Sequence, residues 1–377
     1  MFHIWTLLPA LYLLFRFVRP LTISLVLKII IGLLIAAVCE FHWFTRLLTG
    51  NMFSPELSRP LMILVGWLFG VAVFLAGLLL LRDALYLILR ILFGQPLTHQ
   101  SGLRGLLLAV AVILSSVAVW QGIRAPQVNH VRITLKGLPP QFEGFSIVQL
   151  ADLHSSRLLP RNWVQDVVTR TNALNADLIV LTGDMVDGWV MSRYGDIEPL
   201  GDLRAKHGVW AVTGNHEYYF CAPDWVKTFE KLGLTFLNNS ATRITQGSAA
   251  IYLAGVTDAV APKYGLQGPQ LNDALAARRP DDTVILLDHR PGNARQNEEM
   301  GVSLQLSGHT HGGMISGLDK LIGSANNGFV SGQYPLGAMT LYVSNGTGIW
   351  NGFPFRLGKQ SEITLITLHS TNHVLRS

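Results

Sequence analysis

Aspartate, asparagine and histidine residues recur in short motifs in the second half of the chain, most of them flanked by glycine. The motifs are Asp152-Leu-His154, Gly183-Asp184, Gly214-Asn215-His216-Glu217, Asp288-His289 and Gly308-His309-Thr310-His311-Gly312-Gly313. A mixed set of oxygen and imidazole ligands suits Mn, Fe or Zn better than Mg or Ca. The residue types therefore predict a centre that binds divalent metal ions.

The spacing within the motifs predicts what the metals do. Residues i and i+2 at the end of an extended strand point to the same side, so we expect Asp152 and His154 to bind one ion. His309 and His311 have the same spacing, which predicts that their imidazoles approach a common centre. Asp184 has two carboxylate oxygens, enough to bridge a pair of cations. Two metals about 3.5–4 Å apart activate a water and neutralise the charge that builds on a phosphoryl group, so the motifs together predict phosphoester hydrolysis.

Apolar runs precede the motifs, as expected of strands that carry ligands at their ends. We expect strands at 130–136, 145–151, 178–182, 209–212, 284–287, 302–306, 340–343 and 363–368, and helices at 162–174, 223–232 and 270–277. This succession of strand, loop and helix predicts α/β layers, in which ligands gather where strands end in loops. Five successive strand ends then present side chains that are able to bind metal.

The first third of the chain has a different composition. Hydrophobic residues make up 49% of the whole sequence and charged residues 14%, against about 25% charged residues in an ordinary soluble domain. Most of this excess lies in four apolar stretches, and three of them are near the roughly 20 residues that span a bilayer. The stretches are 4–18, 21–39, 61–81 and 103–120. The sequence predicts a membrane anchor of about four spans at 1–122, a linker and first strand at 123–144, and a catalytic domain at 145–377.

The distribution of arginine predicts the orientation in the membrane, because basic loops stay in the cytoplasm. With four spans, one side receives five arginines before the globular domain and the other receives two, Arg46 and Arg59. This places the catalytic domain of a multi-pass inner (cell) membrane protein outside the cytoplasm. The net charge of +5 is scattered, which argues against nucleic acid as a partner, and no protein partner is inferred.

The motif order resembles that of the calcineurin-like metallophosphoesterase superfamily over residues 145–369. The variants Gly183-Asp-Met-Val-Asp187 and Gly308-His-Thr-His-Gly-Gly313 look closest to the membrane-associated branch of YkuE- and YaeI-like phosphodiesterases. Met314 departs from that branch, which commonly has Gln there. The resemblance implies an α/β sandwich of two mixed β-sheets flanked by helices, following the transmembrane α-helices.

The resemblance also implies different roles for the site residues. The first ion would be held by Asp152, His154 and His311, the second by Asn215, His289 and His309, and both by Asp184. His216 would face the scissile phosphate as a general acid or transition-state stabiliser. Asp187 and Glu217 would orient ligand imidazoles, and a purely structural role is the alternative for both.

The substrate is left open by the ligands, since phosphomonoesters, phosphodiesters and pyrophosphates all fit two metals. The membrane context and the resembled branch imply a phosphorylated small molecule or a lipid-linked phosphate, such as a UDP-diacylglucosamine-like glycolipid. Trp350, Phe353 and Phe355 either form an apolar lip for acyl chains or simply pack. A non-catalytic membrane-bound binding or sensory module on the same scaffold is the alternative function, and the complete ligand set argues against it.

Overall fold

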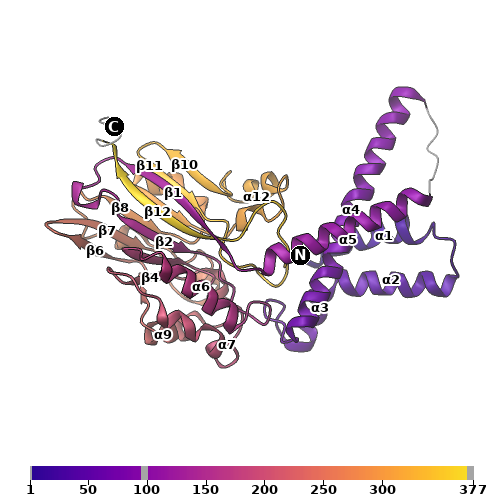
Figure 1. Cartoon of the computed structure of the whole chain (residues 1–377), viewed down its shortest axis with the longest axis horizontal. Helices are drawn as coiled ribbons and strands as arrows, with labels where there is room; N and C mark the ends of the chain where they lie inside the picture. Colours follow the sequence, from indigo (N-terminus) through magenta and orange to yellow (C-terminus); the bar gives the residue numbers. More distant parts are fainter. Residues whose placement is uncertain (1, 95–100, 372–377) are drawn as a thin grey trace. The chain divides into compact units, whose positions relative to one another are not determined.

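The computed structural model describes residues 2–94 and 101–371. The chain divides into two compact units (Figure 1). The helical unit comprises Met1–Gly122 together with Asn351–Leu357, and the sandwich unit comprises Ile123–Trp350 together with Gly358–Ser377.

The described part of the helical unit is built from five α-helices. They are α1 (Phe2–Leu13, continued by a π-helical turn at Leu14–Val18), α2 (Leu25–Cys39), α3 (Phe41–Thr49), α4 (Arg59–Phe93) and α5 (Ser101–Ile123). Of the described helices, α4 and α5 are long and apolar enough to cross a membrane, and the bent pair of α2 and α3 would make a third span. The first predicted stretch forms a shorter apolar helix over Ile4–Val18. The count of four spans stays a prediction.

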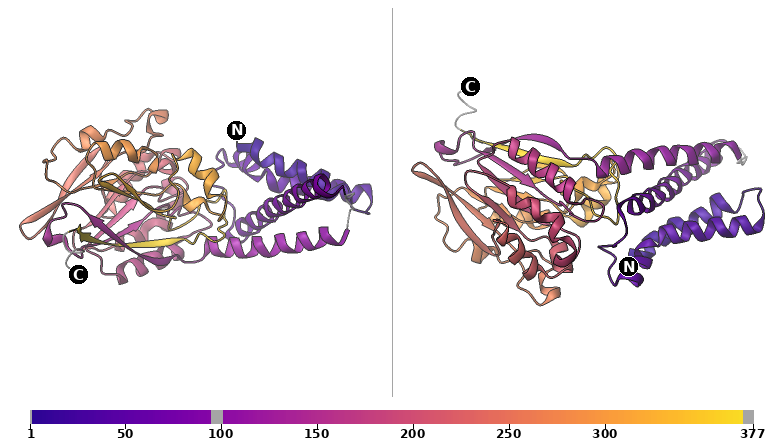
Figure 2. Two further views of the ribbon diagram at one scale, coloured as in Figure 1. Left: turned by 90° about the horizontal axis from the view of Figure 1, so that it is seen from above. Right: turned by 60° about the horizontal axis from the view of Figure 1, so that its bottom comes forward.

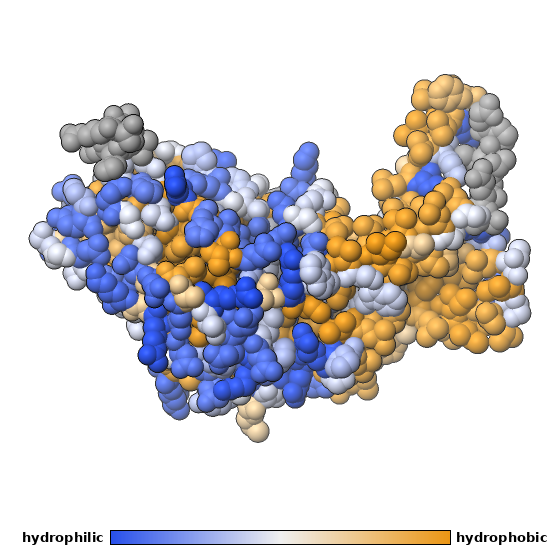
Figure 3. All heavy atoms as spheres, viewed as in Figure 1, coloured by the Kyte–Doolittle hydropathy of each residue, from blue (hydrophilic) through white to orange (hydrophobic). Residues whose placement is uncertain are grey.

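Large apolar side chains cover the outside of these helices (Figure 3). On α4, for example, Leu80, Leu81 and Leu92 are 60%, 69% and 66% exposed. A continuous apolar surface of this kind is costly in water and marks a surface that contacts lipid or another apolar partner. The helices therefore have the surface of a membrane-associated segment.

The short segment Asn351–Leu357 packs within the helical unit. The rings of Phe353 and Phe355 lie 5.7 and 6.0 Å from the ring of Phe69 on α4, and Phe355 is only 2% exposed. The carbonyl oxygen of Gly352 lies 2.8 Å from Nε2 of His42. Phe355 therefore packs in the interior, the alternative to an apolar lip that the sequence left open.

The sandwich unit contains two six-stranded mixed sheets (Figures 1 and 2). The first has the order β1-β12-β2-β3-β4-β5. Its strands are β1 (Gln127–Leu135), β2 (Ser146–Leu150), β3 (Leu178–Thr182), β4 (Val209–Val212), β5 (Thr235–Phe236) and β12 (Glu362–Ser370). Neighbours pair in parallel except β12 and β2, which are antiparallel.

The second sheet has the order β10-β11-β9-β8-β7-β6. Its strands are β6 (Ser240–Gln246), β7 (Ala249–Gly255), β8 (Val284–Leu287), β9 (Leu304–Ser307), β10 (Gly332–Leu336) and β11 (Met339–Val343). The inner strands β7, β8, β9 and β11 are parallel, and the outer strands β6 and β10 are antiparallel to their neighbours.

The two sheets share one core. Ile147 and Val180 of the first sheet belong to the same buried cluster as Leu253, Ile285 and Leu306 of the second. Helices flank the two sheets (Figures 1 and 2), and Val164 and Val168 on α6 are buried. The helices are α6 (Arg161–Ala173), α7 (Val190–Ile197), α8 (Asn215–Tyr219), α9 (Ala222–Lys231), α10 (Leu271–Ala274), α11 (Ala294–Glu299) and α12 (Asp319–Ala325). The predicted fold class, apolar helices followed by two mixed sheets flanked by helices, is confirmed.

Candidate metal centre

The carboxyl ends of strands from both sheets supply the candidate site. Residues after β2, β3 and β4 come from the first sheet, and residues after β8 and β9 come from the second. The sandwich brings them together in three groups whose ligand atoms lie within 4.8 Å of one another. The groups are Asp152, His154 and His311; His154, Asp184 and His216; and Asp184, His289 and His309.

The first group converges on a single point. Nε2 of His154 lies 3.1 Å from Nε2 of His311, and the latter lies 3.8 Å from Oδ1 of Asp152. Two imidazole nitrogens and a carboxylate oxygen that face one another in this way are the donors that a transition metal prefers. The side chains of His154 and Asp152 are fully buried, so water contributes little to their solvation.

The second group adjoins the first through Asp184. Nε2 of His289 lies 3.3 Å from Oδ2 of Asp184 and 3.2 Å from Nδ1 of His309. The same Oδ2 atom lies 3.8 Å from Nε2 of His154. One carboxylate oxygen therefore stands between two histidine clusters, the position that a bridging ligand needs.

The two histidines of the Gly308–Gly313 motif separate, unlike the expectation from their spacing. His311 stacks with His154, and His309 contacts His289. The spacing rule assumes extended backbone, but His309 and His311 have φ of 72° and 50°. Positive φ turns each side chain out of the strand alternation, so neighbouring positions reach different groups. Their separation follows the division that the family resemblance implies.

Hydrogen bonds on the far side of the imidazoles fix which nitrogen faces the centre. Oδ1 of Asp187 lies 3.1 Å from Nδ1 of His154 and 2.6 Å from Nδ1 of His216. Nδ1 of His289 lies 2.8 Å from the carbonyl oxygen of Thr182. Nδ1 therefore carries the proton in these three rings, and Nε2 is directed to the site.

Glu217 acts on the backbone instead of on an imidazole. Its carboxylate accepts hydrogen bonds from the amides of Gly214, Asp184 and Met185 at 2.7, 3.0 and 2.7 Å. Glu217 thereby ties the turn after β3 to the turn after β4. Asp184 in turn accepts a hydrogen bond at 2.8 Å from the amide of His216. The sequence left open whether Glu217 orients a ligand imidazole or has a purely structural role, and its hydrogen bonds here are to the loops that carry the ligands.

Mutual electrostatics shift the pKa values of three histidines of the centre. Burial opposes protonation of His216, yet the carboxylates of Asp184 and Asp187 raise its pKa to about 9. His289 is shifted in the same way by Asp184, to a pKa of about 10. Burial and the nearby charge of His289 hold the pKa of His309 well below its usual value. Without metal, the positive charge of protonated imidazoles offsets the negative charge of the buried carboxylates. A bound cation would supply this positive charge instead, and the imidazoles would release their extra protons as it binds.

Three residues at the centre were missed by the motif search. Arg290 donates to Oδ1 of Asn215 at 2.9 Å and to Oδ2 of Asp258 at 2.7 Å, and Tyr219 accepts from Nδ2 of Asn215 at 3.1 Å. Arg290 directly follows the predicted ligand His289, which was the available signal. Asp258 follows β7 without a histidine beside it, so its sequence context carried no such signal.

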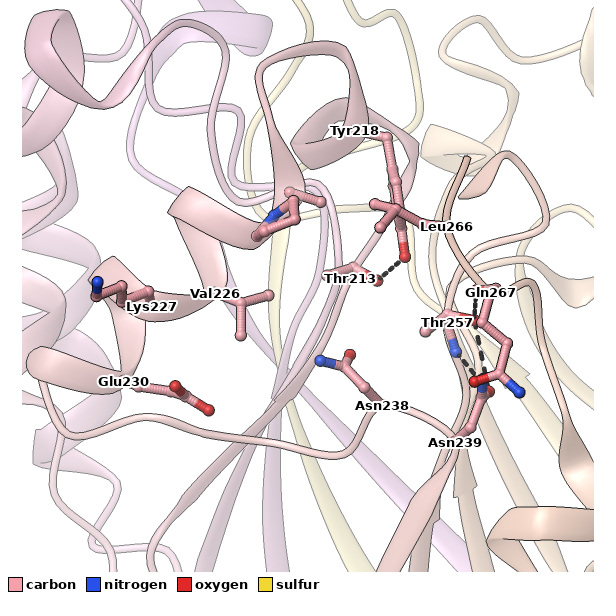
Figure 4. A pocket seen from close by; sticks show the side chains of 12 residues that line it. Thr213, Tyr218, Val226, Lys227, Glu230, Asn238, Asn239, Thr257, Leu266 and Gln267 are labelled. Carbon is pink, nitrogen blue, oxygen red and sulfur yellow. Dashed lines mark hydrogen bonds between the residues drawn. The ribbon is translucent and has the colours of Figure 1, made fainter. Parts of the chain in front are cut away.

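A pocket of about 390 Å³ lies next to the centre in the sandwich unit. Thr213 and Tyr218, which flank the Gly214–Glu217 motif, form part of its wall and share a hydrogen bond of 3.0 Å (Figure 4). Lys227 and Glu230 of α9 line it from another side (Figure 4). The described residues that line the pocket include none of the predicted metal ligands.

Comparison with known proteins places these features in a family. The family model for calcineurin-like phosphoesterases matches residues 145–313. A Danio rerio protein named transmembrane protein with metallophosphoesterase domain is 32% identical over 272 residues, which cover 70% of this chain and 62% of that protein. A Bacillus subtilis protein named uncharacterized metallophosphoesterase YkuE is 31% identical over 247 residues, which cover 62% of this chain and 82% of that protein.

The match spans less than two thirds of the zebrafish protein's own length. Among solved structures, a dimetal phosphatase from Danio rerio aligns with a TM-score of 0.36 at 14% identity, covering 54% of this chain and 88% of that chain. A similarity of this size bears on neither substrate nor mechanism. The sequence matches, together with the strand-end ligands described above, show that the chain belongs to the calcineurin-like metallophosphoesterase family.

Proposed function

We propose that the protein is a membrane-anchored phosphoester hydrolase that uses two divalent metal ions. One observation carries the proposal: Oδ2 of Asp184 lies between two histidine clusters, 3.8 Å from Nε2 of His154 and 3.3 Å from Nε2 of His289. A carboxylate in this position suits a pair of ions and has no evident use in an ordinary fold. A site for a single ion would need only one of the clusters.

The donor set fits two ions of the transition series. Asp152, His154 and His311 would hold the first, while Asn215, His289 and His309 would hold the second, with Asp184 shared. Imidazole nitrogens and carboxylate oxygens suit Mn, Fe or Zn. When bound, such a pair supplies an activated water and charge neutralisation at the phosphoryl group.

The chain's own residues have separate tasks. Asp187 holds Nδ1 of His216 at 2.6 Å, and we assign to Nε2 of the same ring the donation of a hydrogen bond or a proton to a phosphate oxygen. That nitrogen lies 4.0 Å from Oδ2 of Asp184, beside the position proposed for the metals. His216 would stabilise negative charge on the phosphoryl group and protonate the leaving oxygen.

The substrate we propose is a phosphodiester or pyrophosphate carried by a lipid or glycolipid, with a UDP-diacylglucosamine-like molecule as the example. The support is the combination, in one chain, of a phosphoesterase centre with helices apolar enough to cross a membrane. An enzyme tethered to a bilayer meets lipid-linked substrates at high local concentration. We further propose a multi-pass arrangement with the catalytic centre outside the cytoplasm, as the arginine distribution predicts.

The test compares substrates on the full-length protein in lipid nanodiscs with Mn²⁺. We expect hydrolysis of a chromogenic phosphodiester, and a higher kcat/KM for a glycolipid pyrophosphate in the same discs than for its water-soluble headgroup analogue. Equal kcat/KM for the lipid and headgroup forms would refute the substrate class while leaving the hydrolase intact. Metal binding without turnover of any phosphoester would instead favour the non-catalytic module.

A further inference from the structure

Arg290 lies against the histidine cluster proposed for the second metal ion. Its Nη2 donates to Oδ1 of Asn215 at 2.9 Å, and its Nη1 lies 3.1 Å from Nε2 of His309. Asn215 follows β4, His309 follows β9, and Arg290 itself follows β8. One guanidinium therefore connects three strand ends and touches two of the proposed ligands.

A buried carboxylate holds this guanidinium in place. Nε of Arg290 donates to Oδ2 of Asp258 at 2.7 Å, and the Asp258 side chain is fully buried. Oδ1 of Asp258 accepts the amide of Val260 at 2.8 Å, which fixes the carboxylate. The pair is close to neutral overall, so Arg290 adds little net repulsion toward a cation beside it. Since Nε, Nη1 and Nη2 each contact a partner, the guanidinium is held in one orientation before a metal ion binds.

The contact decides which atom of the Asn215 amide faces the centre. Arginine has only donors, so the amide atom 2.9 Å from Nη2 has to be the oxygen. The amide nitrogen then donates to Tyr219 at 3.1 Å. An amide oxygen has two lone pairs, and it can accept from Arg290 while it binds an ion. With the amide turned around, its NH₂ group would face the cation and would not bind it.

We propose that Arg290, anchored by Asp258, is a positioning residue that presents the Asn215 oxygen to the second metal ion and thereby sets the affinity of that ion. This inference rests on the two-metal function proposed above. Arg290 makes no described contact with Asp152, His154 or His311, so we expect its main effect on the second ion. The first ion should bind as before when Arg290 is replaced.

Metal binding by the full-length protein in detergent tests the inference without relying on turnover. Equilibrium dialysis against a range of Mn²⁺ concentrations, followed by elemental analysis, gives the number of bound ions and the affinity of each. For Arg290→Met we expect the affinity of the second ion to fall by about 10- to 100-fold, the usual effect of losing a partner of a metal ligand. The first ion should be unaffected, so an intermediate concentration leaves one ion in the variant and two in the wild type.

Two further variants separate geometry from charge. Arg290→Lys keeps the positive charge, but one ammonium group cannot reach Asp258, Asn215 and His309 together, so we expect the second ion to remain weakly bound. Asp258→Asn keeps the guanidinium and loosens its anchor, which should weaken the second ion by a smaller factor. Thermal unfolding of each metal-free variant checks that the fold is retained.

Arg243→Met is the matched control. Arg243 of β6 forms an ion pair of 2.7 Å with Asp282, the same shortest distance as in the Arg290–Asp258 pair. Asp282 precedes β8, at the end of that strand opposite to His289, so this pair is remote from the centre. We expect two ions with unchanged affinities in Arg243→Met.

The contrary results are distinct. An Arg290→Met protein that binds its second ion as tightly as the wild type, or more tightly, would overturn the positioning role. Full recovery in Arg290→Lys would show that charge alone suffices and would overturn it as well. A wild-type protein that never binds a second ion would contradict the two-metal function itself, and the inference would fall with it.

Discussion

At the scale of single residues, Asp187 organises two histidines with different tasks. Its Oδ1 atom receives Nδ1 of both His154 and His216. His154 belongs to two of the possible metal groups, and His216 to one of them. The geometry alone thus leaves His216 within reach of a metal, whereas its proposed task is to act on the phosphate. The distinction has an experimental answer.

His216→Ala should lower kcat by about 10²- to 10⁴-fold, the usual contribution of a positioned proton donor. Its metal content should stay at two ions per chain, because the other proposed ligands are untouched. Elemental analysis and turnover of a chromogenic phosphodiester measure the two quantities. His130→Ala, at an exposed position of β1, is the control and should match the wild type. Loss of an ion from His216→Ala would make His216 a ligand.

At the scale of elements, the centre depends on how closely the turns after β3 and β4 approach. Gly183 has φ of 90°, and a Cβ atom there would lie 2.5 Å from the amide nitrogen of Gly214 and 2.7 Å from Nδ1 of His289. Only glycine fits both the backbone conformation and the space. Glu217 then fastens the two turns through three backbone amides.

Gly183→Ala should therefore separate the two turns and destabilise the sandwich unit by about 1–3 kcal/mol through backbone strain, with the steric clash adding to this. We expect a lower thermal unfolding temperature and a reduced metal content in the full-length protein. Gly195→Ala is the matched control, since a Cβ there meets nothing within 4 Å inside α7. This substitution should leave stability equal or slightly higher. Similar behaviour of the two variants would show that the approach of the turns is unimportant.

The sequence predicted the elements whose pattern is local. The buried runs at β2, β3, β8 and β12 were found within about two residues of their observed bounds, and so was α6. The hairpin of β6 and β7 was missed, because Ser240–Gln246 is polar along most of its length and lies at the sheet edge. The helix expected at 270–277 shortens to Leu271–Ala274.

The site residues likewise divide into those that a local sequence pattern predicts and those that it does not. The strand-end ligands stood in recognisable motifs. Arg290 and Asp258, in contrast, meet only because β7 and β8 are neighbours in the sheet, and no local spacing encodes that pairing. The left-handed backbone of His309 and His311 could not be predicted from the sequence either. Their common centre was therefore inferred from an extended-strand geometry that the loop does not have.

At the scale of the whole molecule, the chain passes between its two units three times. It leaves the helical unit after Gly122, returns for Asn351–Leu357 and departs again. Trp350, the last residue before the return, has its ring 6.1 Å from the ring of His216. Within the helical unit the next residues pack on Phe69 and His42. The residue that contacts His216 is thus covalently continuous with a segment buried among the helices.

The orientation of the domain can be predicted without knowing the number of spans. Whether two, three or four stretches cross, α4 and α5 form the last pair, and the sandwich unit emerges on the side opposite to their connection. Arg82, Arg90 and Arg104 lie near that connection, which predicts that it is cytoplasmic.

Reporter fusions after Phe93 and after the C-terminus test this topology. A reporter that works only in the cytoplasm should be active after Phe93 and inactive at the C-terminus, while a periplasmic reporter should give the reverse. Cytoplasmic activity at both positions would remove the external assignment and place the catalytic centre in the cytoplasm.

The central claim, that Asp184 joins two metal ions in a hydrolytic centre, is tested most directly by Asp184→Asn. Turnover of a chromogenic phosphodiester by the full-length protein in Mn²⁺ is measured beside Asp282→Asn, a substitution in the remote ion pair. Replacing an outer partner of a metal ligand already costs about 10- to 100-fold, so losing the bridge should lower kcat at least 100-fold, with fewer than two ions bound. Asp282→Asn should retain both ions and wild-type turnover. Unchanged turnover in Asp184→Asn would contradict the account.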